Sequence, residues 1–200
     1  MWKIKNIYAT ARDRTAWLLL QHRTLTVAKH GPWDHTHCTA CPADENQEHL
    51  FSCPDIYNHY WETIMEITTD MGFTPGTGPK YWILGLKGDT GIVDREEADI
   101  ISWAWRSLYA VVVESHSEKI GLNYEKALLY FTQYMYSRTT AYGYRWRRWY
   151  LGQRMGNKPK MFPTRFREKK LVRMDAFANW KLNPNITKWY KRVRDWHNTD

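Results

Sequence analysis

Three cysteines and one histidine stand close together in the sequence at a spacing that suits a metal ion. Cys38, Cys41, His49 and Cys53 form the pattern C-x2-C-x7-H-x3-C, and they include every cysteine of the chain. A zinc ion takes four sulfur or nitrogen donors at about 2.0 to 2.3 Å in a tetrahedron, and a C-x2-C turn can offer two thiolates to one ion. The spacing therefore predicts a closed zinc site.

The residues around this pattern favour metal binding over simple burial of cysteines. His49 and Cys53 are four residues apart, so in a helix both side chains lie on one face. The stretch PADENQE between Cys41 and His49 is too polar for a core, although cysteine is among the most buried residue types and a core role is the alternative. His35 and His37 are alternative donors.

The same region resembles a known family. Its motifs are similar to the zinc-binding region that follows the polymerase domain in LINE-type (non-LTR retrotransposon) reverse transcriptases, and AWRSLYAVVVES and SRTTAYGYRWRRW resemble the tail after that finger. The likeness covers roughly residues 10 to 175. It implies binding of RNA or DNA beside a polymerase domain or within a ribonucleoprotein. The motifs that carry it are Arg12 or Arg14, Trp17, Leu20, His22-Arg23, C-x2-C, EHLF, Cys53-Pro54 and Trp61.

Composition points to an anionic partner and away from membranes. The net charge is +8 with a pI near 9.3, which favours nucleic acid. No apolar run approaches the length of a membrane span, and no secretory signal opens the chain. We expect an intracellular protein, nuclear or cytoplasmic. A mitochondrial location is the alternative, because the first thirty residues hold six Lys or Arg and one acid.

Positive charge concentrates between Arg138 and Arg173, where twelve Lys or Arg stand against one acid, Glu168. Within this tract YGYRWRRWYLGQR interleaves arginines with aromatic rings. Guanidinium groups pair with phosphates, and flat rings stack on unpaired bases. The alternative is a helix with buried rings and solvated arginines. We expect nucleic-acid contacts from Arg138, Arg145, Trp146, Arg147, Arg148, Arg154, Lys158, Lys160, Arg165, Arg167, Lys169 and Lys170.

Hydrophobic periodicity predicts a mainly α fold, with a small helical zinc-finger module followed by long packed helices and a basic C-terminal arm. We expect helices over residues 10–30, 54–71, 94–120 and 123–149, with a candidate strand at 81–86. A short helix over 166–173 and a docking helix over 189–196 complete the pattern, with disorder at the end of the chain as the alternative. The predicted domains are 1–72 (helix plus zinc module), 73–93 (loop), 94–155 (helical pair) and 156–200 (basic, partly extended arm).

Catalytic motifs are missing from the sequence. A polymerase needs paired aspartates for two metal ions, and the chain contains no Asp-Asp pair. Zinc deaminases need an open coordination position and a P-C-x-x-C motif, whereas four protein donors would close this site. We therefore expect a non-catalytic nucleic-acid-binding module. The alternatives are a structural ribonucleoprotein subunit derived from such an element, or an element remnant with no selected role.

Overall fold

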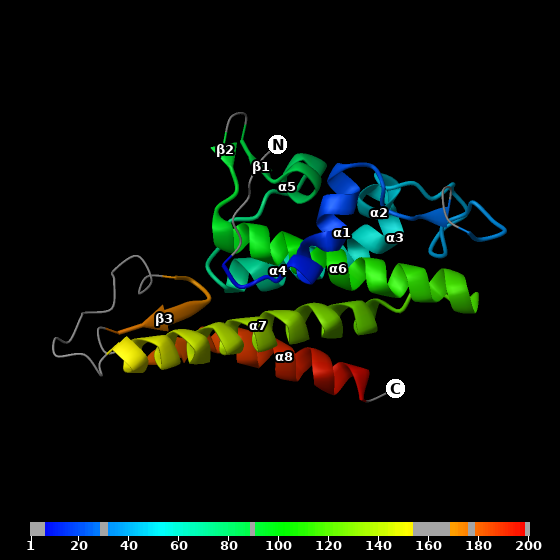
Figure 1. The fold of residues 1–200 in the computed structure, drawn as a ribbon. Coiled ribbons are helices and arrows are strands. Elements are labelled where there is room, and N and C mark those ends of the chain that lie inside the picture. The colour runs from blue at the N-terminus through cyan, green and yellow to red at the C-terminus, as the bar shows by residue number, and fades with distance from the viewer. Residues whose placement is uncertain (1–6, 29–31, 89–90, 154–168, 176–178, 199–200) are drawn as a thin grey trace.

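The computed structural model describes residues 7–28, 32–88, 91–153, 169–175 and 179–198. The fold is mainly α-helical, as the sequence predicts. In Figure 1, α6 runs across the middle, α1, α2 and α5 lie above it, and α7 and α8 lie below it. The elements are α1 (Ala11–Gln21), α2 (His49–Ser52), α3 (Pro54–Ile56), the π-helical turn η2 (Tyr57–Trp61), α4 (Glu62–Asp70), α5 (Pro79–Leu84), β1 (Leu86–Lys87), β2 (Gly91–Ile92), α6 (Arg95–Glu118), α7 (Tyr124–Gln153), β3 (Val172–Met174), β4 (Trp180–Leu182) and α8 (Pro184–His197).

The first helix begins as predicted but is shorter than expected. Thr10 and Asp13 form the capping box that starts α1. The helix ends at Gln21 and not at residue 30, because Arg23 adopts a left-handed conformation with φ of 54°. The Thr24 amide then donates to the Leu19 carbonyl at 2.8 Å, which closes the helix end. Leu25 and Val27, which follow this turn, are buried although their segment is not helical. Their apolar spacing therefore predicted a longer helix than the structure contains.

The second predicted helix, 54–71, is confirmed as the run α3, η2 and α4, and Gly72 follows it with φ of 87°. The candidate strand at 81–86 is wrong. Pro79 opens the short helix α5 there, and Gly85, with φ of 67°, ends it. Only the next residues are extended: β1 and β2 pair antiparallel, with Leu86 opposite Ile92.

The central helix α6 is buried along most of its length, as predicted. Asp94 and Glu97 form its capping box. A cluster of tryptophans covers it, with the Trp61 ring centroid 5.2 Å from Trp82 and 4.9 Å from Trp105. The indole N–H of Trp105 donates to the Trp82 carbonyl at 2.7 Å. The short helices are therefore fixed onto α6 by indole groups that are both packed and hydrogen-bonded.

Two buried carboxylates in the first turns of α6 join distant parts of the chain. Asp99 accepts the backbone N–H groups of residues 7, 8 and 9, each at 2.9 Å. Glu96 accepts the Tyr8 hydroxyl at 2.8 Å and the backbone N–H groups of Lys170 and Leu171 at 2.9 and 3.2 Å. The helix start, where the dipole favours negative charge, thus anchors both the N-terminal segment and the approach to β3.

The predicted pairing of α6 with a second long helix is present, since α7 turns back along α6 after a short connection. Asn123 caps α7 by accepting the Lys126 amide at 2.7 Å. Helix α7 passes through Gly143 without a break, and the Trp180 ring packs against this glycine. A Cβ atom at Gly143 would lie 2.4 Å from Trp180 Cδ2, so the missing side chain lets β4 approach α7.

The described residues after residue 168 form two strands and one helix. Strands β3 and β4 pair antiparallel, with Arg173 opposite Lys181. The helix expected over 166–173 is wrong for its described residues, because Val172 and Arg173 lie in β3; residues 166–168 lie outside the described part. The expected docking helix is confirmed as α8, which packs along α7 with Tyr136 and Tyr190 stacked at 5.0 Å.

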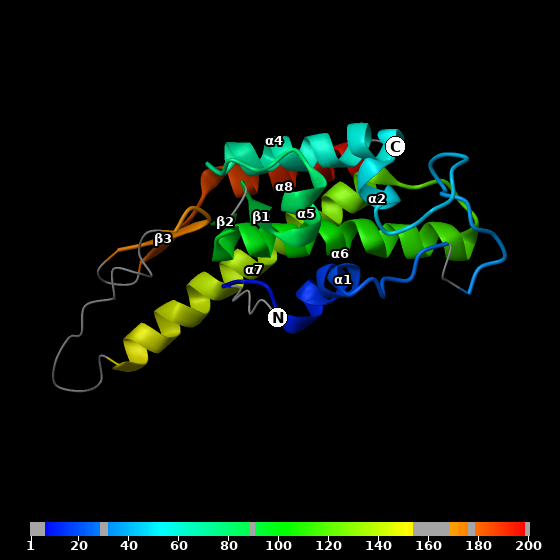
Figure 2. The same ribbon diagram turned by 90° about the horizontal axis from the view of Figure 1, so that it is seen from above.

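Helix α8 also contacts the N-terminal half. Figure 2 shows α4 lying over α8, and the Trp189 indole N–H donates to the Asp70 carboxylate at 2.8 Å. Among the residues that the structure describes, no helix is both long and apolar enough to cross a membrane.

Candidate metal centre and basic surface

The loop before α2 places Cys38 and Cys41 on a tight turn. The Cys38 amide donates to the Ala43 carbonyl at 2.9 Å, and the Glu45 amide donates to the Thr36 carbonyl at 2.8 Å. These two bonds hold a turn that contains both cysteines and leads toward the start of α2. We call residues 32–56 the cysteine–histidine segment.

Helix α2 supplies the other two donors of the cluster. Asn46 Oδ1 accepts the His49 amide at 2.9 Å and so fixes the first turn of α2. Cys53 ends the helix one turn later, where its amide donates to the His49 carbonyl at 2.7 Å. The predicted separation of four residues therefore places both side chains on the side of α2 that faces the cysteine turn.

The four predicted donors lie together. The ligand atoms of Cys38, Cys41, His49 and Cys53 are all within 4.8 Å of one another, and Cys41 Sγ is 3.2 Å from His49 Nε2. Donors about 2.3 Å from one ion at tetrahedral angles are about 3.8 Å apart. The cluster could therefore hold a metal ion, and its donor set and spacing are compatible with zinc.

The alternative histidines lie elsewhere. His37 is an exposed side chain whose Nδ1 is 3.5 Å from the Asp44 carboxylate. The His35 ring packs against His116, with centroids 5.1 Å apart. Neither belongs to the cluster, and within the part of the chain that the structure describes His49 is the histidine that completes it.

Burial disfavours the charged form of the Cys38 and Cys53 thiols unless a cation is bound beside them. Burial raises the pKa of the Cys38 thiol to about 12, against the opposing effect of the Ala40 amide, whose nitrogen is 3.4 Å from Cys38 Sγ. Burial also raises the pKa of Cys53. The segment 32–56 contains no Lys or Arg to offset a thiolate. A divalent cation would supply the missing charge and hold the thiols deprotonated.

Two polar contacts that the sequence did not reveal fasten this segment to the long helices. Glu45 Oε1 lies 2.8 Å from Nε2 of His116 on α6, and it also accepts the Ala28 amide at 2.9 Å. Tyr124, at the start of α7, donates a hydrogen bond to Asp55. A charged or polar residue has no periodic signal in sequence, so partners this far apart are visible only in the fold.

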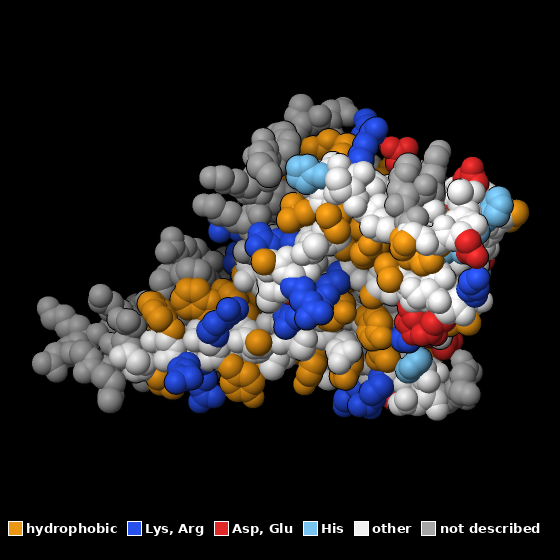
Figure 3. Space-filling view, turned by 45° about the vertical axis from the view of Figure 1, so that its right-hand side comes forward, with side chains coloured by type: hydrophobic (Ala, Val, Ile, Leu, Met, Phe, Trp, Pro, Cys, Tyr) orange, Lys and Arg blue, Asp and Glu red, His pale blue; other side chains and the backbone are white. Residues whose placement is uncertain are grey.

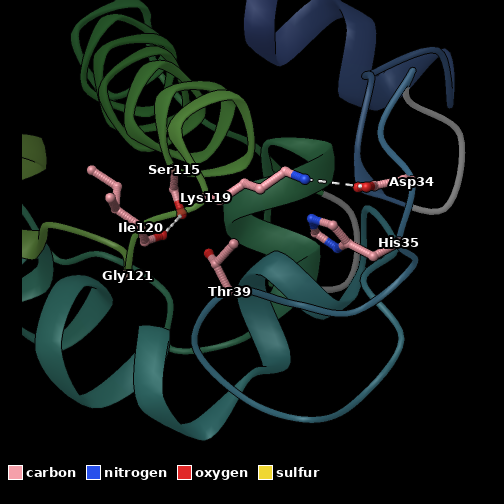
Figure 4. Close-up of a pocket in the computed structure, with 7 residues that line it drawn as sticks. All are labelled: Asp34, His35, Thr39, Ser115, Lys119, Ile120 and Gly121. Carbon is pink, nitrogen blue, oxygen red and sulfur yellow. Dashed lines mark hydrogen bonds and ion pairs between the residues drawn. The ribbon is translucent and has the colours of Figure 1, made fainter.

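A hollow of about 550 Å³ separates the cysteine–histidine segment from the end of α6 (Figure 4). An ion pair of 3.2 Å between Asp34 and Lys119 spans it, and both side chains are largely exposed. Ser115 donates to the Ile120 carbonyl at 2.7 Å and closes the helix end. Within the hollow, Asp34 and Lys119 thus partner each other, and Ser115 has a backbone acceptor.

The structure places the predicted nucleic-acid residues in different surroundings. Arg145, Arg147 and Arg148 are exposed on α7. Arg138 differs from the expectation: its Nε is 2.9 Å from the buried Asp13 carboxylate, so it is an ion-pair partner inside the fold. Lys169 and Lys170 precede β3, with Lys170 Nζ 4.4 Å from the Phe73 ring centroid, and Trp146 is half-buried. Arg154, Lys158, Lys160, Arg165 and Arg167 lie outside the described residues.

Helix α8 adds a basic face that the prediction did not include. Ile186, Trp189 and Val193 face inward, and the intervening cations are exposed. The signal was the spacing of these apolar residues at three and four positions, which leaves Lys188, Lys191, Arg192 and Arg194 on the outside. Figure 3 shows Lys and Arg along the lower side of the molecule, over α7 and α8, whereas Asp and Glu gather toward its right-hand side.

Comparison of the chain with protein-family models, with curated proteins and with solved structures finds no match.

Proposed function

We propose that the protein is a non-catalytic nucleic-acid-binding module whose N-terminal half is stabilised by one zinc ion. In this proposal Cys38, Cys41, His49 and Cys53 hold zinc, and the exposed cations of α7 and α8 bind the phosphates of RNA or DNA. The role is similar to that implied by the resemblance to the region downstream of the polymerase in LINE-type reverse transcriptases.

The closed donor set supports a structural zinc ion. Four protein donors complete a tetrahedron and leave no position for a substrate or an activated water. The loop that carries Cys38 and Cys41 buries few apolar side chains, so the metal would replace a hydrophobic core as the source of its stability.

The observation that carries the binding proposal is the uneven distribution of charge. Residues 138–153 contain four Arg and no acid, and the described residues from 169 to 198 contain eight Lys or Arg and two Asp. The cysteine–histidine segment contains five acids and no Lys or Arg. Like charges held this densely repel one another unless an anion offsets them, so phosphates belong on the helical pair and not on the metal segment.

The test is the salt dependence of binding. Each phosphate neutralised by a cation releases counterions, so the logarithm of affinity falls linearly with the logarithm of salt. Replacing Arg145, Arg147 and Arg148 by Gln should flatten this slope by about two to three units if each contacts a phosphate. The matched control replaces three exposed cations of the N-terminal half and α6, so that net charge changes equally: Arg12, Lys80 and Arg95 to Gln.

The control variant should keep most of the wild-type slope, measured by fluorescence anisotropy with a labelled RNA hairpin from low to physiological salt. Equal flattening in both variants would mean that only the total charge matters. An unchanged slope in the α7 variant would show that this face does not contact phosphate.

A further inference from the structure

Strands β3 and β4 form a small antiparallel ribbon whose two faces differ. In each strand the middle residue is exposed, whereas its neighbours are buried or half-buried. Because side chains alternate between the two faces of a strand, one face of the ribbon packs inward and the other is open. The inner face lies against α7, where the Trp180 ring is 5.2 Å from the Tyr144 ring (Figure 1).

The open face carries two positive charges directly opposite each other. Arg173 of β3 and Lys181 of β4 are partners in the strand register, and both side chains are exposed. Directly opposed residues have Cβ atoms about 4.5 to 5.5 Å apart, and like charges in such a pair destabilise it. Among the residues that the structure describes, no hydrogen bond or ion pair offsets either charge.

An acid at the end of the ribbon has other partners. Asp175 follows β3 directly, and its two carboxylate oxygens accept hydrogen bonds from Asn179, at 2.9 Å from the backbone amide and 2.8 Å from the side-chain amide. Neither Arg173 nor Lys181 forms an ion pair with it. The repulsion between the two cations therefore remains in the folded protein, and an anion bound between them would remove it.

The ribbon connects the basic part of α7 with the start of α8. Arg147 and Arg148 follow Tyr144 by three and four residues, so they lie one turn further along the side of α7 that contacts Trp180. At its other end β4 leads through Asn183 directly into α8. The cations of the ribbon thus continue the basic surface of the two helices.

We propose that Arg173 and Lys181 together hold one phosphate of a bound RNA or DNA strand. A phosphodiester has one negative charge and two free oxygens, so one oxygen can accept from the guanidinium group and the other from the ammonium group. The inference rests on the proposed nucleic-acid binding and adds to it a defined contact outside the two helices.

The variant Lys181→Glu should change stability and binding in opposite directions. It replaces a repulsive pair across the ribbon by an attractive one, so Tm at low salt without nucleic acid should rise by about 2 to 4 °C. The same change removes the phosphate contact and adds a repelling charge, so affinity for the labelled RNA hairpin should fall about tenfold. A substitution that only disturbed the fold would lower both quantities.

Neutral variants show whether the two cations act as a pair. Arg173→Gln and Lys181→Gln each remove the repulsion, so the double variant should be no more stable than either single variant, and roughly 1 M salt should abolish the gain. The double variant should flatten the salt dependence of binding by about one unit, the value for one phosphate. The matched control is Lys80→Gln with Arg95→Gln, which removes the same charge from exposed positions and should keep the wild-type slope.

The outcomes separate the two proposals. A Lys181→Glu protein that is more stable but binds the hairpin like wild type would overturn the phosphate contact and leave binding by α7 and α8 intact. A lower Tm would also overturn it, because the two cations would then not repel each other. If Lys181→Glu weakens binding of polyglutamate but not of RNA, the pair binds an acidic protein instead, and the proposal is wrong. No binding of the hairpin by wild-type protein at low salt would overturn both proposals.

Discussion

The cysteine–histidine segment and the α7–α8 pair are held together by different means and carry opposite charge. The segment has five acids, no Lys or Arg, and side-chain donors gathered within 4.8 Å. The helical pair buries a continuous set of aromatic and aliphatic side chains and exposes cations on its outer faces. One region is organised by a cluster of metal-type donors, and the other by packing.

This difference separates stability from recognition in our proposal. A zinc ion with three thiolates and one imidazole has a formal charge of about −1, so it adds nothing that would attract phosphate. The five acids around it repel phosphate further. The metal would therefore shape the N-terminal half, while the surface proposed to bind nucleic acid, on α7 and α8, lies on the opposite side of α6 (Figure 1).

The largest expected effect is on the cysteine–histidine segment and comes from removing the metal. Reduced wild-type protein should contain one zinc per chain, and Cys53→Ser should lose it. The lost metal-binding free energy is on the order of 10 kcal/mol. Hydrogen exchange after chelation should rise first in residues 32–56 and least in α6 and α7.

His37→Ala is the matched control, because His37 is exposed and lies outside the donor cluster. It should retain both zinc and the wild-type melting temperature. Elemental analysis that finds no zinc in reduced wild-type protein would remove the metal from the proposal.

The donor cluster was predictable from sequence because ligand spacing is local. C-x2-C requires only a tight turn, and His49 and Cys53 require only one helical turn. The Glu45–His116 contact was not predictable, since it joins residues that are 71 positions apart. The cations of α8 were not among the predicted binding residues, although the spacing of Ile186, Trp189 and Val193 after Pro184 is that of an amphipathic helix with cations on its other side.

A smaller effect should follow from breaking the contact that joins the two regions. Glu45→Ala would leave the His116 ring and the Ala28 amide buried without their partner. We expect a loss of about 3 kcal/mol in the free energy of unfolding, the lower end for removing one member of a buried polar pair. The measurement is urea denaturation followed by circular dichroism.

Glu48→Ala serves as the control for this prediction. Glu48 is exposed and lies 3.8 Å from the exposed Arg23, so its loss should change the free energy of unfolding by less than about 0.5 kcal/mol. If the two variants have equal stability, the segment does not depend on its attachment to α6.

The bounds of the helices show which features local sequence signals can predict and which they cannot. Capping boxes at Thr10 and Asp94 marked the helix starts correctly, because capping is decided within one turn. The end of α1 was missed because a left-handed arginine, and not a glycine, terminates it. Residues 81–84 form a helix because Trp82 and Tyr81 are buried against the rest of the fold, a tertiary effect that a short apolar run does not encode.

The smallest expected effect concerns the helical pair, where packing alone decides stability. Gly143 lies inside α7, where alanine would normally stabilise a helix by up to about 1 kcal/mol. Here a Cβ atom would lie 2.4 Å from the Trp180 ring, so the strand β4 must move away. We expect Gly143→Ala to lower the free energy of unfolding by about 2 kcal/mol, the usual cost of overpacking.

Gly152→Ala provides the opposite sign in the same helix. A Cβ atom at Gly152 has no neighbour within 4 Å, so only the helix propensity changes and stability should rise slightly. Paired thermal melts of the two variants measure both effects, and neither should alter zinc content. If Gly143→Ala is as stable as Gly152→Ala, the Trp180 ring of β4 does not pack on α7 at Gly143 as described.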